Sequence, residues 1–188
     1  MQHEQTIPGP VVIGGVGGSG TRVVSEMMIA LNYYMGSHLN EALDNFWFLV
    51  LFNQPEWYFE NAANNPAEID RVLAFFERAM REGLKPTPKN FMLIMSRYLS
   101  FSKYINLNRP VSIRHDKTGP RRIQHGLSLN WQRFVAMLGM LHAPRPSPDR
   151  YRGWGWKNPI SQIYLPYILE RFGDDMKYIQ VIRHGLDM

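Results

Sequence analysis

Residues 11–22 read VVIGGVGGSGTR, and this segment decides the fold class. Its first three residues are apolar and β-branched and stand between a proline and a glycine, which predicts a buried strand. A loop with five glycines over residues 14–20 follows, and residues 21–35 then carry apolar side chains at helical spacing. A strand, a glycine-rich loop and a helix in this order predict the start of an α/β domain.

A glycine-rich loop in this place is typical of an anion-binding site. Glycines let backbone N–H groups approach a phosphate closely, and the helix that follows offers its positive end to the anion. A tight turn that binds nothing is the alternative without a function.

Two nucleotide-binding motifs match the loop only in part. Three glycines within residues 15–20 fit the dinucleotide pattern G-x-G-x-x-G, but residues 36–41 do not read as the second strand that this pattern needs. In an ATP- or GTP-binding P-loop, Thr21 would stand in place of the lysine and Arg22 in place of the magnesium-binding hydroxyl residue. A P-loop-type kinase or NTPase is therefore an alternative with little support.

The rest of the chain reads as a helical middle, residues 37–150, followed by further strands. Asn65, Pro66 and Glu68 predict the N-cap, first-turn proline and capping-box acid of a helix that Gly83 ends. The other predicted elements are helices over residues 87–104 and 129–141, a strand over 151–157, an amphipathic helix over 160–172 whose alternative start is Pro166, and a strand over 177–182.

The composition predicts one globular domain over residues 1–188. Of the 188 residues, 45% are hydrophobic and 20% are charged, and the net charge of +5 favours an anionic ligand. The basic residues are scattered, so we expect no nucleic-acid partner. The chain has no cysteine, which excludes disulfides and thiol catalysis. The most apolar run, residues 46–52, is too short to span a bilayer, and the N-terminus lacks the apolar segment of a signal peptide, so we expect a cytoplasmic protein of open oligomeric state.

Two cations stand at the ends of the last two predicted strands. Lys157 lies in the sequence WKNP after the first of them, and Arg183 follows the second. Ligands of open α/β sheets bind at the carboxyl ends of the strands, where the arginine fork suits a phosphate. A lysine at a neighbouring strand end can stabilise charge on a leaving oxygen. For each residue, a solvated strand-end cation is the alternative.

The Ser-Gly-Thr of the loop, Lys157 and Arg183, in this order, resemble the sulfotransferases that use 3′-phosphoadenosine 5′-phosphosulfate (PAPS). The resemblance covers two blocks, residues 10–36 and 151–188. It implies a P-loop-like three-layer α/β fold with a parallel sheet and a large helical insertion between the two blocks. It also implies transfer of a sulfuryl group from PAPS to a hydroxyl or amine, with PAP as the product and no metal.

The resemblance assigns the donor site to the loop and to Arg183, which would bind the 3′-phosphate, and it makes Lys157 a catalytic residue. The family loop has a lysine or arginine in the place of Gly18, so Arg22 or a lysine from elsewhere would cover the sulfate charge. The loop residues expected to bind PAPS are Gly17, Gly18, Ser19, Gly20, Thr21 and Arg22.

The resemblance also bears on the catalytic base. Some sulfotransferases use a histidine two residues after the strand-end lysine, where this chain has Pro159. Tyrosylprotein and several carbohydrate sulfotransferases use a glutamate after the first helix, which makes Glu41 the expected base. His38 and Asp44 are close rivals, and a solvated loop acid is the alternative.

The acceptor stays open between a carbohydrate, a lipid, a peptide tyrosine and a small phenol. The aromatic stretch over residues 46–59 could form an acceptor wall or belong to the core. The family places a serine on the 3′-phosphate at a position beyond Met188, so we expect the chain to be an incomplete sulfotransferase. A non-enzymatic anion-binding module is the remaining alternative.

Overall fold

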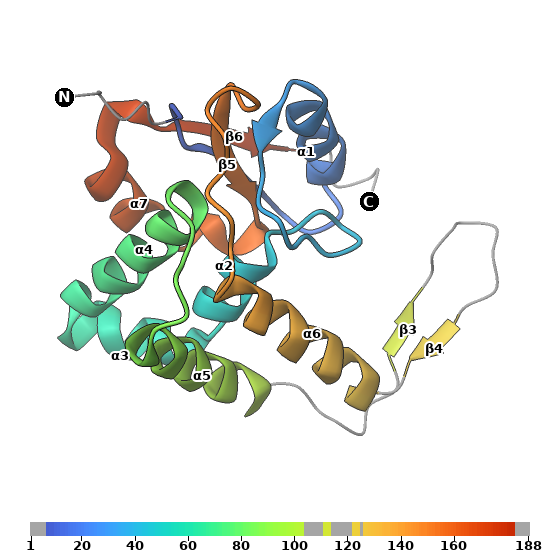
Figure 1. Ribbon diagram of the computed structural model, residues 1–188, viewed down its shortest axis with the longest axis vertical. Coiled ribbons are helices and arrows are strands. Elements are labelled where there is room, and N and C mark those ends of the chain that lie inside the picture. The colour runs from blue at the N-terminus through green and yellow to red at the C-terminus, as the bar shows by residue number, and fades with distance from the viewer. Residues whose placement is uncertain (1–6, 104–110, 114–121, 125, 183–188) are drawn as a thin grey trace.

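Four parallel strands form the central sheet (Figure 1). The computed structural model describes residues 7–103, 111–113, 122–124 and 126–182. Within these residues every pair of neighbouring strands in this sheet is parallel, and the order is β2-β5-β1-β6. The predicted α/β class with a parallel sheet is therefore confirmed. The four strands are β1 (Val11–Gly15), β2 (Tyr33–Tyr34), β5 (Gly153–Lys157) and β6 (Lys177–Val181).

Strand β1 lies inside the sheet, and its register sets which residues meet at the carboxyl edge. Ile13 pairs with Lys157 of β5, and Gly15 pairs with Val181 of β6. Because parallel strands all end at one edge, the glycine-rich loop, Lys157 and the end of β6 meet there. This is the edge at which open α/β sheets bind ligands.

Helices cover both faces of the sheet and give the three layers of the expected fold (Figure 1). Helix α1 (Thr21–Ala30) packs along β1 and β5 on one face. Helices α2 (Phe46–Phe52), α4 (Pro66–Arg81) and α7 (Leu165–Phe172) lie on the other face.

The face that α2 and α4 cover holds an aromatic core. Phe48 of α2 stacks on Trp156 of β5, with ring centroids 5.5 Å apart and an interplanar angle of 23°. Phe76 of α4 meets both rings edge-on, at 5.3 Å from Phe48 and 5.1 Å from Trp156. All three side chains are fully buried, so they contribute large apolar areas to the core. The aromatic residues of α2 therefore belong to the core rather than to a wall open to an acceptor.

The longer helices of the middle follow the sequence-based expectations. Helices α4 and α5 (Pro88–Lys103) begin at a proline, and α6 (Gly126–Met140) covers all but the last residue of the helix predicted over residues 129–141. Within the described residues, no helix combines the length and apolar character that crossing a bilayer requires. The remaining elements are α3 (Pro55–Asn64), the antiparallel strands β3 (Val111–Ile113) and β4 (Arg122–Gln124), and the 3-10 helices η1 (Pro159–Gln162) and η2 (Gly173–Asp175).

The helix after the loop is shorter than predicted. It ends at Ala30 rather than at residue 35, because Asn32 adopts a left-handed backbone conformation with φ of 61°. Tyr33 and Tyr34 then pair with β5 as the edge strand β2. The prediction of a helix through residues 31–35 is therefore wrong.

The predicted capping box of α4 is also wrong. The Asn65 side chain makes no capping hydrogen bond, and the Glu68 carboxylate instead accepts two hydrogen bonds of 2.6 Å from Arg71. These hydrogen bonds lower the pKa of Glu68. In the segment over residues 160–172, helix α7 begins at Leu165 with Pro166 in its first turn, which is the alternative start that the sequence left open.

The aromatic core predicts a large effect of one substitution. Replacing Phe48 with alanine should lower the free energy of unfolding by about 3–5 kcal/mol, because it removes a buried ring and leaves a cavity. Phe59 is 69% exposed, and Phe59→Ala should cost less than about 1 kcal/mol. Urea unfolding followed by circular dichroism measures both values. Equal losses for the two variants would contradict the assignment of the core.

Candidate functional site

The loop between β1 and α1 turns sharply at its glycines. Gly15, Gly18 and Gly20 have φ angles of 151°, 87° and 95°, which L side chains rarely adopt. The Ser19 N–H donates to the Val16 carbonyl at 3.0 Å and closes the turn. The backbone path of the loop therefore favours glycine at these three positions.

The outer side of the loop is open, and it leads to the N-terminus of α1. Counting only the described residues, a Cβ atom built on Gly17, Gly18 or Gly20 would meet no atom within 4 Å. The first turn of α1 has no acidic side chain, and no side chain caps it. The positive end of the helix dipole is therefore not neutralised by the helix itself, and an anion could approach the loop backbone closely.

A buried hydroxyl lies beneath this loop without a partner. Ser19 is 6% exposed, and its Oγ has no hydrogen-bond partner among the described residues. The hydroxyl lies on the strand side of the loop, since a Cβ on Gly15 would come within 3.0 Å of it. Buried polar groups are normally hydrogen-bonded, so the Ser19 hydroxyl is one group of this loop that a bound anion would satisfy.

Arg22 does not add its charge to the loop in this structure. Its Nε donates to the Glu26 carboxylate at 3.0 Å, one turn along α1. Both side chains are at least half exposed, and a surface pair of this kind contributes little stability. The resemblance implies a positive charge at the loop, from Arg22 or from a lysine elsewhere. The charge of Arg22 is directed along α1 instead.

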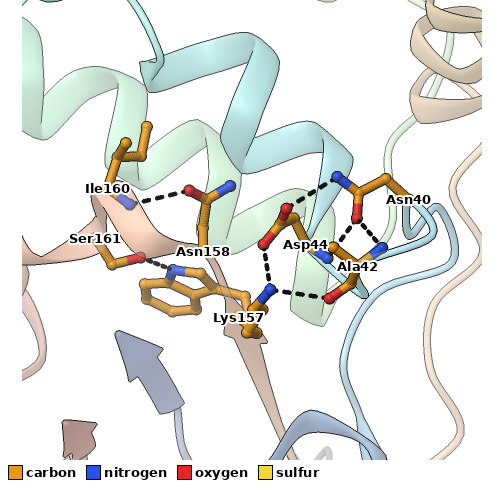
Figure 2. A network of polar contacts seen from close by, with 8 residues as sticks. Asn40, Ala42, Asp44, Lys157, Asn158, Ile160 and Ser161 are labelled. Carbon is orange, nitrogen blue, oxygen red and sulfur yellow. Dashed lines mark hydrogen bonds and ion pairs between the residues drawn. The ribbon is translucent and has the colours of Figure 1, made fainter. Parts of the chain in front are cut away.

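Lys157 is the buried cation at the carboxyl edge of the sheet. Its side chain is 4% exposed, and its ammonium donates to Asp44 Oδ1 at 2.6 Å and to the Ala42 carbonyl at 2.9 Å (Figure 2). The Lys157 carbonyl also accepts a hydrogen bond of 2.8 Å from the Asn45 N–H, just before α2. Both the backbone and the side chain of Lys157 are therefore tied to residues 42–45.

The chain after Lys157 is held in place as well. The Asn158 side chain accepts a hydrogen bond of 3.1 Å from the Ile160 N–H and caps η1. The Trp156 indole N–H donates to Ser161 Oγ at 3.0 Å. These contacts fix the exit from β5, and Figure 2 shows them beside the ion pair of Lys157.

The three residues considered for the catalytic base lie on one segment but in different surroundings. Asp44 contacts Lys157 directly, whereas Glu41 is exposed on the turn that precedes it. His38 is half-buried, with its ring centroid 5.8 Å from that of Trp47 and its Nδ1 3.0 Å from Ser37 Oγ. Burial lowers the pKa of His38, because it disfavours the charged imidazolium.

Several expectations for the site lie beyond what the structure describes. Arg183, the expected ligand of the 3′-phosphate, lies outside the described residues. Strand β6, which precedes it in the sequence, ends at Val181 at the same edge as the loop. Over the described ranges, no group of three or more His, Cys, Asp or Glu side chains could hold a metal ion.

Comparison of the chain with protein-family models, with curated proteins and with solved structures found no match.

Sequence reasoning placed the loop and Lys157 but missed the role of Asn40. This residue bonds to Asp44 through its side chain and its backbone, and it shapes the turn that contacts Lys157. A possible signal was the pair of Asn40 and Asp44, since asparagine and aspartate often bond to nearby backbone groups in turns.

The burial of His38 predicts a pH dependence. Its folded-state pKa lies below the ordinary value of about 6.5, so the unfolded chain binds more protons as the pH falls below that value. The contribution of His38 to stability is therefore complete above about pH 6.5 and is lost as the pH falls toward the folded-state pKa. An NMR titration should give His38 a midpoint below that of the same ring in the urea-unfolded chain. Equal midpoints would contradict this.

Proposed function

We propose that this chain carries the donor site of a PAPS-dependent sulfotransferase. The observation that carries the proposal is the orphaned, buried Ser19 hydroxyl in an open glycine loop at the N-terminus of α1. A phosphate or sulfate group offers oxygens to such a hydroxyl and to the backbone N–H groups around it. The family order of the loop, Lys157 and Arg183 supports the choice of PAPS among nucleotide anions.

In this proposal the loop residues, Gly17 to Thr21, bind the 5′-phosphosulfate of the donor, and Arg22 would add its charge only on leaving Glu26. Arg183 follows β6 in the sequence and would bind the 3′-phosphate, since the arginine fork matches phosphate oxygens. The 3′-phosphate distinguishes PAPS and PAP from AMP and ATP, so this contact would set the selectivity of the site.

The reaction would be an in-line displacement at sulfur. A bond forms between the acceptor oxygen and sulfur, while the bond between sulfur and the oxygen of the 5′-phosphate breaks. Lys157 would donate a hydrogen bond to that leaving oxygen, where negative charge develops. The acceptor proton would pass to Glu41, or to His38, whose ring is neutral near pH 7 because burial lowers its pKa. The products are PAP and the sulfated acceptor.

Calorimetric titration with PAP, AMP and ATP tests the donor site. PAP should bind more tightly than AMP, and Arg183→Ala should weaken PAP binding by about 10- to 100-fold while AMP binding barely changes. Ser19→Ala should weaken PAP binding by about 5- to 30-fold, because it removes a hydrogen bond to the anion.

Ser25 provides the matched control for Ser19. It lies in the middle of α1, is fully buried, and its Oγ also has no partner among the described residues. Ser25→Ala should therefore leave PAP affinity unchanged if the loop is the site. Equal losses for the two serine variants, or ATP hydrolysis that requires magnesium, would contradict the proposal, and the latter would favour a P-loop kinase or NTPase.

The proposed role of Lys157 predicts a separate effect on turnover. Lys157→Ala should lower kcat about 100-fold or more, because the lysine acts on charge that develops in the transition state. PAP affinity should stay within a few-fold of the original value. Steady-state assays with PAPS and a phenolic acceptor measure kcat, and calorimetry measures the PAP affinity. A variant with normal turnover would show that Lys157 has only a structural role.

A further inference from the structure

The turn over residues 40–44 engages two of the three donors of the Lys157 ammonium. One N–H bonds to Asp44 and another to the Ala42 carbonyl, at 2.6 Å and 2.9 Å. A lysine ammonium has three N–H donors, so one donor remains beyond its two contacts with the described residues. Figure 2 shows Asp44 and Ala42 on the same side of the lysine, next to Asn40.

The turn over residues 40–44 is closed by hydrogen bonds of its own. Asn40 Oδ1 accepts from the N–H groups of Ala42 at 3.0 Å and Asp44 at 2.8 Å. Two backbone bonds join the ends of the turn, from the Asn40 N–H to the Asp44 carbonyl and from the Leu43 N–H to the Asn40 carbonyl. These bonds hold the Asp44 and Ala42 acceptors in place beside Lys157.

The Asp44 carboxylate is directed at groups of the protein on both sides. Its Oδ1 accepts from Lys157, and its Oδ2 accepts from Asn40 Nδ2 at 2.9 Å. A general base needs an oxygen within hydrogen-bond reach of the acceptor hydroxyl, with its lone pair facing it. Asp44 is 14% exposed, and its geometry suits holding a cation better than accepting a proton from a substrate.

We propose that residues 40–44 form a clamp that positions the Lys157 ammonium at the carboxyl edge of the sheet and leaves one N–H for an incoming anionic group. Asp44 and Asn40 are positioning residues in this arrangement. The clamp removes rotamer freedom from a long side chain before the ligand arrives, which lowers the ordering cost of binding or reaction. Only the identity of the anionic group, the sulfuryl donor, rests on the proposed function.

The reactivity of Lys157 toward a small acylating reagent tests the clamp without any nucleotide. Trace labelling with acetic anhydride, followed by peptide mass spectrometry, gives the rate for each lysine. The exposed Lys85 and Lys89 are internal references. Lys157 should react about 10-fold or more slowly than these, and Asp44→Asn should raise its rate about 10-fold, because a charge-assisted hydrogen bond is lost. Asp44→Glu should restore most of the protection.

Two further variants complete the test. Asn40→Ala removes the support of Asp44 and should also raise the reactivity of Lys157, and it carries the test if Asp44→Asn does not fold. Glu56→Gln on α3 makes the same charge change as Asp44→Asn, but at an exposed position. It should leave the acylation rate of Lys157 unchanged. The Tm of each variant shows that the labelling was done on folded protein.

The outcomes separate the clamp from the proposed function. Unchanged Lys157 reactivity in folded Asp44→Asn and Asn40→Ala would overturn the clamp, whether or not PAP binds. In a PAPS assay, Asp44→Asn should lower kcat with PAP affinity unchanged, and Asp44→Glu should recover part of it. A loss of kcat without a change in Lys157 reactivity would make Asp44 a base and overturn its positioning role. Protected Lys157 in a chain that does not bind PAP would refute the donor site and support the clamp.

Discussion

The stacking of Phe48 on Trp156 joins the helical layer to the sheet, and the position of the site depends on it. Trp156 is on β5, and the next residue is Lys157. The ring of Phe48 belongs to α2, whose N-cap residue, Asn45, bonds to the Lys157 carbonyl. Helix α2 therefore packs against β5 in the core, and the N–H of its N-cap residue donates a hydrogen bond to the last carbonyl of β5 at the carboxyl edge. A site that must hold a cation in place gains rigidity from two attachments to one packed element.

The two halves of the candidate site would bind the proposed anion through different kinds of groups. The loop offers backbone groups, a helix N-terminus and the Ser19 hydroxyl, none of which carries a formal charge. The Lys157 ammonium carries a formal charge, but it forms an ion pair with the Asp44 carboxylate. Among the described residues of this edge, the charge of Lys157 is thus largely balanced, and in the proposed site shape and hydrogen-bond direction would select the ligand more than bulk attraction would.

The sequence predicts the elements that depend on local patterns of residues. It does not predict the elements and contacts that depend on residues far apart in the chain. The buried strand before the glycines and the helix that starts at Pro66 follow from local composition, and both are confirmed. Strand β2 was missed because the apolar pattern continues past Ala30, and only the pairing of Tyr33 with β5 shows where the helix ends. The contact of Lys157 with Asp44 joins residues 113 positions apart, and no spacing rule reports on such a pair. The roles of Ser19, Glu41 and Arg183 stay predictions.

Strand β5 alternates glycine with tryptophan in the sequence GWGWK, and this alternation makes its alignment hard to change. A one-residue slip would exchange the faces of all its side chains. It would bring an indole to the place of Gly155, where even a methyl carbon would come within 2.0 Å of the Val11 carbonyl oxygen. It would also leave a glycine where Trp156 fills the core. The strand thus disfavours one-residue shifts of its pairing, which would move the lysine that ends it away from its position on the edge.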